Sequence, residues 1–298
     1  MARLAWIFVL YLPWTALAAP GFDYIWITPD PPGKTHKNIQ EMGIKWVTFQ
    51  QLRQASDWPE PQVVVANNIR ALQMLEELPN ACAANKLKTA DRAARFYYSD
   101  LPQTLFPGLK LYTLKNSGLA HHLTGIKELQ GRISVVDALA FVSEKQFGLV
   151  GGRRYGDQLD PLLTKTQWQF QIWRRTAADM GAGMVDMLLR GRISALIEHP
   201  NSAHHYAREL GKENELQGFD LQETPNSSMG YIICSKTPQG LALKQHFDGL
   251  LQQVSRQQTY LDTHLAWMPT LDQQAYIDLY NEVYGTRFTL VEVSAQAD

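Results

Sequence analysis

A glycine-rich turn contains the first residues whose types and spacing suggest a binding function. Residues 151–156 read GGRRYG and separate the apolar run Phe147–Val150 from a stretch with helical spacing. Backbone N–H groups of such a turn, together with the N-terminus of the next helix, can receive an anion, and Arg153 would add a full positive charge. The turn lacks the pattern of a phosphate-binding loop. The alternative is that the glycines only form a tight turn and the arginines lie in solvent.

A second group of residues suggests metal binding. Glu198 and His199 are followed by His204 and His205, and imidazole and carboxylate groups are ligands for zinc and other transition metals. However, the spacing differs from that of zinc enzymes, and adjacent residues on a helix point about 100° apart. There is also no nucleophile elbow and no dinucleotide fingerprint. We therefore expect neither a metal nor another cofactor and no enzymatic activity, with a metal-dependent enzyme as the alternative.

Alternating strands and helices must position these residues. Strand-like runs at Tyr24–Thr28 and Val63–Ala66 are followed by helical spacing from Ile69 to Leu78 and another strand at Ala81–Ala84. A strand, a helix and a strand in succession predict parallel pairing in an α/β fold. Further strands are expected downstream at 109–114, 147–150, 193–197 and 231–234, and helices at 157–163, 184–189, 240–261 and 271–284.

Length and charge exclude several classes of protein. The chain has 298 residues, 45% of them hydrophobic, with 28 basic and 29 acidic side chains. This length allows one large or two modest domains, and the hydrophobic content is typical of an ordered globular chain. A near-neutral chain lacks the basic surface that binding to a nucleic-acid backbone requires. We therefore expect no nucleic-acid partner.

The N-terminus has the pattern of a secretory signal peptide. Arg3 precedes an apolar run over Leu4–Leu12, and Ala16 and Ala18 form an A-x-A cleavage site. The run is shorter than the roughly 20 residues that span a bilayer. We therefore predict that residues 1–18 are a signal peptide, cleaved after Ala18, and that the mature protein is exported.

Cys82 and Cys234 are the only cysteines of the chain. Two thiols in an oxidising compartment tend to pair, and a bridge between them would close a loop of about 150 residues. Two separately buried thiols that act as small hydrophobic side chains are the other interpretation. The residues alone leave both open.

The segment 68–99 has a recognisable order of elements. It reads NIRALQMLEELPNACAANKLKTADRAARFYYS, in which a helix and a strand lead to a Thr-x-x-Arg element at 89–92 and an aromatic strand at 96–99. This order resembles the type 2 periplasmic solute-binding proteins of family 3, the amino-acid-binding group, and in particular an exported subgroup. Three later segments, 148–163, 184–197 and 230–236, follow in the order of that family.

The resemblance implies an α/β fold of two lobes, joined by two crossovers, with the ligand in the cleft between them. The crossovers are expected near 104–109 and 227–231. Lobe one then comprises residues 19–107 and 228–298, and lobe two comprises residues 108–227. This arrangement places Cys82 and Cys234 on neighbouring strands of one lobe, which favours a disulfide.

The resemblance also implies ligand contacts. In amino-acid-binding relatives the arginine of the Thr-x-x-Arg element binds the ligand carboxylate, and Arg92 has that position. Glu198 stands where relatives have an aspartate that accepts the ligand's ammonium group, and Gly33 follows Pro32 where relatives have a stacking aromatic residue. Because of these departures, a carboxylate without an amine fits as well as an amino acid. The predicted ligand-binding residues are Asp30, Thr89, Arg92, Arg153, Tyr155, Gly156 and Glu198.

The expected function is therefore solute capture in the periplasm. The resemblance implies a monomer that holds a small polar, carboxylate-bearing solute, such as an amino acid or an organic acid, for ABC-type uptake through a membrane permease complex. The main alternative is a module that reports a ligand to a membrane sensor without transport.

Overall fold

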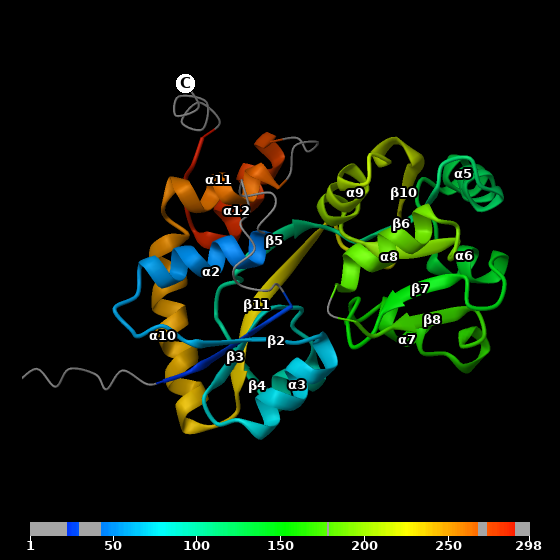
Figure 1. Ribbon diagram of the computed structural model, residues 1–298. Helices are drawn as coiled ribbons and strands as arrows, with labels where there is room; N and C mark the ends of the chain where they lie inside the picture. Colours follow the sequence, from blue (N-terminus) through cyan, green and yellow to red (C-terminus); the bar gives the residue numbers. More distant parts are fainter. Residues whose placement is uncertain (1–22, 30–42, 178, 268–272, 290–298) are drawn as a thin grey trace, which may run out of the picture.

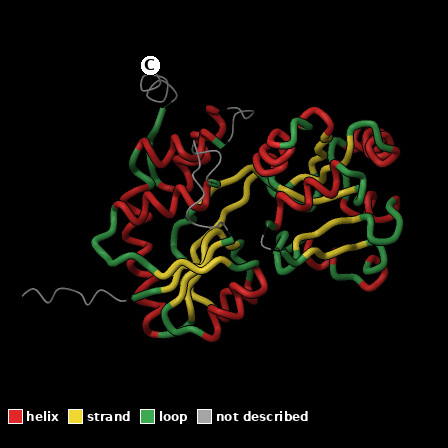
Figure 2. Tube along the Cα trace, in the orientation of Figure 1, coloured by secondary structure: helices red, strands yellow, loops and turns green. Residues whose placement is uncertain are grey.

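The computed structural model describes residues 23–29, 43–177, 179–267 and 273–289 (Figure 1). Two α/β lobes lie side by side, and each is built on its own sheet flanked by helices (Figure 2). The predicted signal peptide and Asp30 lie outside the described residues. Within the described ranges, no helix is both long and apolar enough to cross a membrane.

The sheet of the first lobe has the strand order β2-β1-β3-β11-β4. Strand β1 (Ile25–Thr28) lies between β2 (Gln62–Val65) and β3 (Ala81–Lys86) and runs parallel to both, which confirms the predicted parallel pairing. In contrast, β11 (Ser227–Ser235) is antiparallel to β3 and to β4 (Phe96–Tyr98). The carboxyl ends of β1, β2 and β3 therefore meet at one edge, which is the edge that faces the second lobe in Figure 1.

Helices cover both faces of this sheet. Its aromatic core includes Trp26, which is fully buried and stacks on Phe49 with the ring centroids 4.0 Å apart. The helices are α2 (Ile44–Gln54), α3 (Asn68–Glu77), α4 (Ala90–Arg95), α10 (Pro238–Val254), α11 (Gln258–Ala266) and α12 (Gln273–Tyr284).

The prediction of one helix over 240–261 is wrong, because the chain forms two helices, α10 and α11, there. The break has a physical cause in the packing of the lobe. The hydroxyl of Tyr280, on α12, donates a hydrogen bond of 2.8 Å to the carbonyl of Ser255 at the end of α10. Before this point α10 packs on the sheet and on α2, and after it α11 packs on α2.

The two cysteines form a disulfide within the first lobe. Cys82 on β3 is directly opposite Cys234 on β11, with the Cα atoms 4.0 Å apart. Both residues are completely buried. The structure thus confirms the bridge, and the interpretation as two separate thiols is wrong.

The sheet of the second lobe has the strand order β10-β6-β9-β7-β8. Parallel pairs join β7 (Phe147–Val150) to β8 (Ile172–Arg175) and to β9 (Ala195–Glu198). Antiparallel pairs join β6 (Lys110–Leu114) to β9 and to β10 (Leu216–Asp220). The sequence predicted β6 and β7 closely, placed β9 two residues too early and missed β8 and β10. The helices are α5 (Gly118–Gln130), α6 (Val135–Phe141), α7 (Leu159–Leu163), α8 (Met180–Leu189) and α9 (Pro200–Glu209).

Two antiparallel strands connect the lobes. β5 (Thr104–Pro107) pairs with the first half of β11, from Gly230 back to Ser227, and both strands extend toward the second lobe (Figure 1). Close packing continues at Gly108, where a Cβ atom would lie only 1.9 Å from the carbonyl oxygen of Pro225. We propose that residues 19–107 and 228–298 belong to one lobe and residues 108–227 to the other.

Candidate functional site

A cavity of about 420 Å³ lies between the two lobes. The first lobe contributes the end of β3 with the loop that follows it, Ala84–Leu87, and the second lobe contributes the turn after β7 and the start of α8. Crevices outside the carboxyl ends of parallel strands are the usual ligand sites of open α/β sheets. The cavity is therefore the candidate functional site.

Arg92 is a buried cation in the wall of this cavity. Only 4% of the residue is exposed. Its Nη2 donates a 2.9 Å hydrogen bond to the carbonyl of Gly152 in the second lobe, and its Nη1 donates a longer one, 3.4 Å, to the carbonyl of Leu87. Its Nε is buried and has no hydrogen-bond partner among the described residues. Burial lowers the pKa of Arg92, but a guanidinium keeps its charge in proteins. A buried cation with these bonds favours a further, anionic partner.

Arg153 and Glu198 form an ion pair in the opposite wall. The two guanidinium nitrogens donate to the two carboxylate oxygens of Glu198, each over 2.7 Å, and the backbone N–H of His199 donates to the same carboxylate. Burial disfavours both charges, but their mutual attraction outweighs it, so that the pKa of Glu198 is lowered and that of Arg153 is raised. Both residues line the cavity as a neutralised pair.

Lys86 is a second buried cation of the cavity, which the sequence reasoning did not identify. It is 6% exposed, and its Nζ donates a 2.8 Å hydrogen bond to Oδ1 of Asn68 at the start of α3. Lys86 is the last residue of β3. Its position at the carboxyl end of a parallel strand was therefore the sequence signal that could have identified it.

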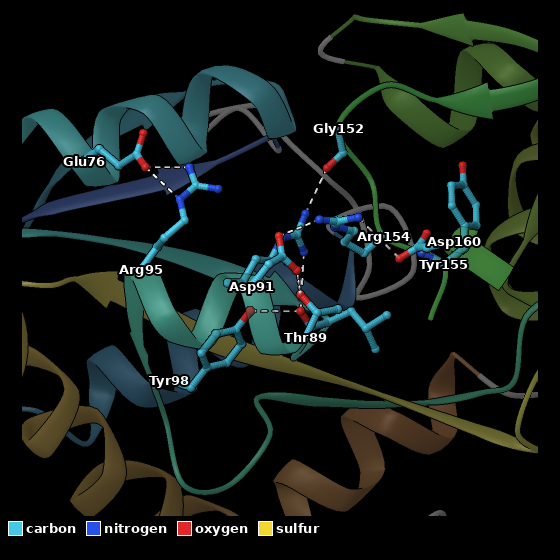
Figure 3. A network of polar contacts seen from close by, with 11 residues as sticks. Glu76, Thr89, Asp91, Arg95, Tyr98, Gly152, Arg154, Tyr155 and Asp160 are labelled. Atoms are coloured by element: carbon cyan, nitrogen blue, oxygen red, sulfur yellow. Dashed lines mark hydrogen bonds and ion pairs between the residues drawn. The ribbon is translucent and has the colours of Figure 1, made fainter. Parts of the chain in front are cut away.

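Contacts between the lobes flank the cavity. Arg154 of the second lobe forms an ion pair with Asp91 of the first lobe over 2.5 Å, close to the bond that Gly152 accepts from Arg92 (Figure 3). At another point His205 on α9 packs against Trp267, with the ring centroids 4.8 Å apart. The two lobes thus touch each other around the cavity.

Solved structures with this arrangement are numerous. A protein from the glutathione import system of Streptococcus mutans, described with GshT and the cystine ABC importer TcyBC, is 17% identical, with a TM-score of 0.59 over 83% of this chain and 96% of the other. The arginine-, lysine-, histidine-binding protein ArtJ from Geobacillus stearothermophilus is 14% identical, with a TM-score of 0.61 over 86% of this chain and 100% of the other. A histidine kinase sensor domain with similarity to periplasmic binding proteins is 10% identical, with a TM-score of 0.59 over 83% and 95%.

The chain has the type 2 periplasmic-binding-protein fold. This confirms the predicted two-lobed α/β architecture. No family model and no curated protein matches the sequence. At these identities the likeness extends to the fold, and the details of the site must come from the residues of this chain.

Within this fold, the predicted ligand-binding residues take different places. Arg92, Arg153 and Glu198 line the cavity. The described lining does not include Thr89, Tyr155 or Gly156. Each of these residues instead has a role in its own segment of the chain. The Thr89 hydroxyl donates to Asp91 over 2.7 Å, the Tyr155 hydroxyl accepts the N–H of Val150 over 2.8 Å, and Gly156 occupies a turn with φ +117°. Asp30 lies outside the described residues.

The histidines of the alternative metal site separate in this fold. His199 stacks on Phe106, and its Nδ1 is hydrogen-bonded to the carbonyl of Pro107. In contrast, Nδ1 of His204 lies 3.9 Å from Oε1 of Glu213. His205 packs on Trp267. Within the described part of the chain, no three His, Cys, Asp or Glu side chains are grouped as metal ligands. The proposed cluster of Glu198 with these histidines therefore does not form there.

The position of His199 predicts a dependence of stability on pH. Burial, together with the charge of Arg153, lowers the pKa of His199 to about 4 against the opposing effect of Glu198. His264, also buried, has a pKa of about 4 as well. Because the folded chain binds these protons more weakly than the unfolded chain does, stability is full above about pH 6.5 and falls as the pH decreases toward 4.

Replacement of His199 by asparagine tests this prediction, because the amide can keep a donor near the carbonyl of Pro107 without titrating. Urea unfolding at pH 7 and pH 5 should show that the variant loses about 2 kcal/mol less than the wild type over this interval. The matching variant His264→Asn should reduce the loss by a similar amount. An unchanged loss in the His199 variant would contradict the prediction.

Proposed function

We propose that this chain is an exported, periplasmic solute-binding protein that holds a small carboxylate-bearing solute in the cavity between its lobes. The observation that carries this proposal is Arg92. Its guanidinium is buried in the cavity wall, its hydrogen bonds go to backbone carbonyls, and no described residue is a hydrogen-bond partner of its Nε. A carboxylate would pair with this charge, and the planar guanidinium favours such a partner.

Three further observations support the proposal. The cavity lies between two lobes connected by two strands, an arrangement that allows the lobes to close on a solute by hinge motion. The signal peptide predicted for residues 1–18 supports export. The neighbours in fold include proteins described as arginine-binding and as part of glutathione import, which makes a small polar solute the leading class of ligand.

For the partner of the loaded protein, we propose a membrane permease of the ABC type. The support is that one neighbour is described together with a cystine ABC importer. Another neighbour is the sensor domain of a histidine kinase, so a sensory function is the second candidate. Copurification of the mature protein with membranes that contain the candidate permease or kinase would distinguish the two partners.

Replacement of Arg92 by glutamine should reduce affinity for a carboxylate by about 10- to 150-fold, because a charge-assisted hydrogen bond contributes about 1.5–3 kcal/mol. The probes are glutarate, 3-phenylpropanoate, L-glutamate, L-phenylalanine and L-arginine. A thermal-shift screen would rank them, and calorimetry would give Kd for those that bind.

Arg95→Gln is the matched control for this measurement. Arg95 lies on the same short helix but is exposed and pairs with Glu76 away from the cavity (Figure 3). This variant should bind like the wild type. Undiminished affinity in Arg92→Gln would refute the function assigned to Arg92.

A further inference from the structure

The carboxylates of the cavity are already neutralised by arginines. Among the described residues that line the cavity, the acidic side chains are Glu198 and Asp179. Glu198 accepts hydrogen bonds from both Nη atoms of Arg153. Asp179 accepts hydrogen bonds from both Nη atoms of Arg175, and the bond from Nη2 to Oδ2 is 2.7 Å long. Neither carboxylate is therefore available to a cation from the ligand unless one of these bidentate ion pairs breaks.

The surroundings of Glu198 leave little room for an additional partner. One of its oxygens also accepts the N–H of His199 over 2.8 Å. The other oxygen faces the start of α8, where a Cβ atom added to Gly181 would lie only 2.7 Å away. Protein groups thus surround the carboxylate on more than one side, and Arg153 occupies the position that an external cation would need.

Basic side chains predominate in the rest of the lining. Lys45, Lys86, Arg92, Arg153 and Arg154 belong to it, against the two acidic residues. The pairs Arg154–Asp91 and Arg175–Asp179 are each neutral, and Arg92, which bonds to backbone carbonyls, adds a positive charge to the lining. The potential inside the cavity therefore favours an anion and disfavours a second cation.

An ammonium group in this cavity would lose its hydration without gaining an unpaired carboxylate among the described residues of the lining. Desolvation of an unpaired charge is costly, and nearby like charges add to the cost. The remaining walls include Phe106, Met229 and Trp267, which can cover an uncharged hydrocarbon body but carry no negative charge to offset an ammonium group.

We propose that the ligand is an organic carboxylate without an ammonium group, and that Arg153 excludes amino acids because it occupies Glu198. This inference rests on the proposed function, since it concerns the ligand of the same cavity. Arg153 is then a specificity-determining residue, and it acts by neutralising an acidic group that would otherwise bind an amine.

Matched pairs of acids test the inference on the full mature chain. Calorimetry would compare glutarate with L-glutamate, 3-phenylpropanoate with L-phenylalanine, and 4-methylpentanoate with L-leucine. In each pair that binds, the acid without the amine should bind at least 10-fold more tightly. Arg153→Gln releases Glu198 and should reduce this preference to less than 3-fold or reverse it.

Arg190→Gln is the control, because this arginine of the second lobe pairs with Asp186 on α8 and neither residue is among the described residues of the lining. It should keep the preference of the wild type. If the amino acids bind as tightly as the amine-free acids in the wild type, the inference is overturned but the proposed function stands. If no member of any pair binds, both are overturned. The comparison within the wild type decides the inference even if Arg153→Gln fails to fold.

Discussion

Replacement of both Cys82 and Cys234 by alanine is expected to lower the free energy of unfolding by about 4 kcal/mol. The disulfide joins residues 152 positions apart, and the entropy of an unfolded chain closed over a loop of this length accounts for a stabilisation of this order. The closed loop contains all five strands of the second lobe. Reversible urea unfolding followed by circular dichroism would measure the difference.

A reductant provides the control for this experiment. The alanine pair should unfold at the same urea concentration with and without dithiothreitol, whereas the wild type should lose stability once the reductant reaches the unfolded chain. A difference below about 1 kcal/mol between the double variant and the oxidised wild type would contradict the expectation. Intact-mass measurement of the wild type would show whether the bridge is present at the start.

The sequence predicted β1, β2, β3 and α3 of the first lobe well because their signals are local. The apolar run that became β1 and the helical spacing that became α3 are complete within a few residues. In contrast, β8 reads Ile-Trp-Arg-Arg and carries two arginines. It is a strand because β7 pairs with it in parallel, and such pairing between distant segments has no local signature.

The sequence indicated three of the residues that line the cavity, but it did not indicate which of them pair with each other. Arg92 was assigned to the cavity from the family resemblance, and the structure places it there. Arg153 and Glu198 were each expected to contact the ligand, but they bind each other across 45 positions of sequence. A pattern of residue types indicates which charges are present, whereas only the folded backbone determines which charges meet.

The second large effect concerns this buried pair. Replacement of Glu198 by glutamine should lower the free energy of unfolding by about 3 kcal/mol, because removal of one partner leaves the other charge buried and uncompensated. The side chain of Glu198 is 2% exposed and that of Arg153 is 22% exposed, so residual solvent contact places the value at the lower end of the range for buried pairs. Urea unfolding at pH 7 would measure it.

The pH dependence of this loss follows from the lowered pKa of Glu198. Since the folded chain holds this proton more weakly than the unfolded chain, the stabilisation is present above the ordinary value of 4.5 and is lost as the pH falls through the folded value. The difference between wild type and Glu198→Gln should therefore shrink as the pH falls below 4.5. The pH range in which Glu198 loses its stabilising effect therefore lies below most of the range in which protonation of His199 and His264 lowers stability.

A surface pair of the same chemistry serves as the matched control. Glu213 accepts two bonds from Arg208, but its side chain is 32% exposed, and pairs of this kind contribute about 0–1 kcal/mol. Glu213→Gln should thus have little effect. If it destabilises the chain as much as Glu198→Gln, burial of the charge is not the cause.

A double-mutant cycle separates the pair from the loss of its members. In the variant that combines Arg153→Gln with Glu198→Gln, no uncompensated charge remains, so it should be more stable than Glu198→Gln alone although it has lost both ionic groups. If the two losses simply add, Arg153 and Glu198 act independently in the folded chain. That result would also remove the physical basis for the exclusion of ammonium groups, because a Glu198 uncoupled from Arg153 would be free to accept one.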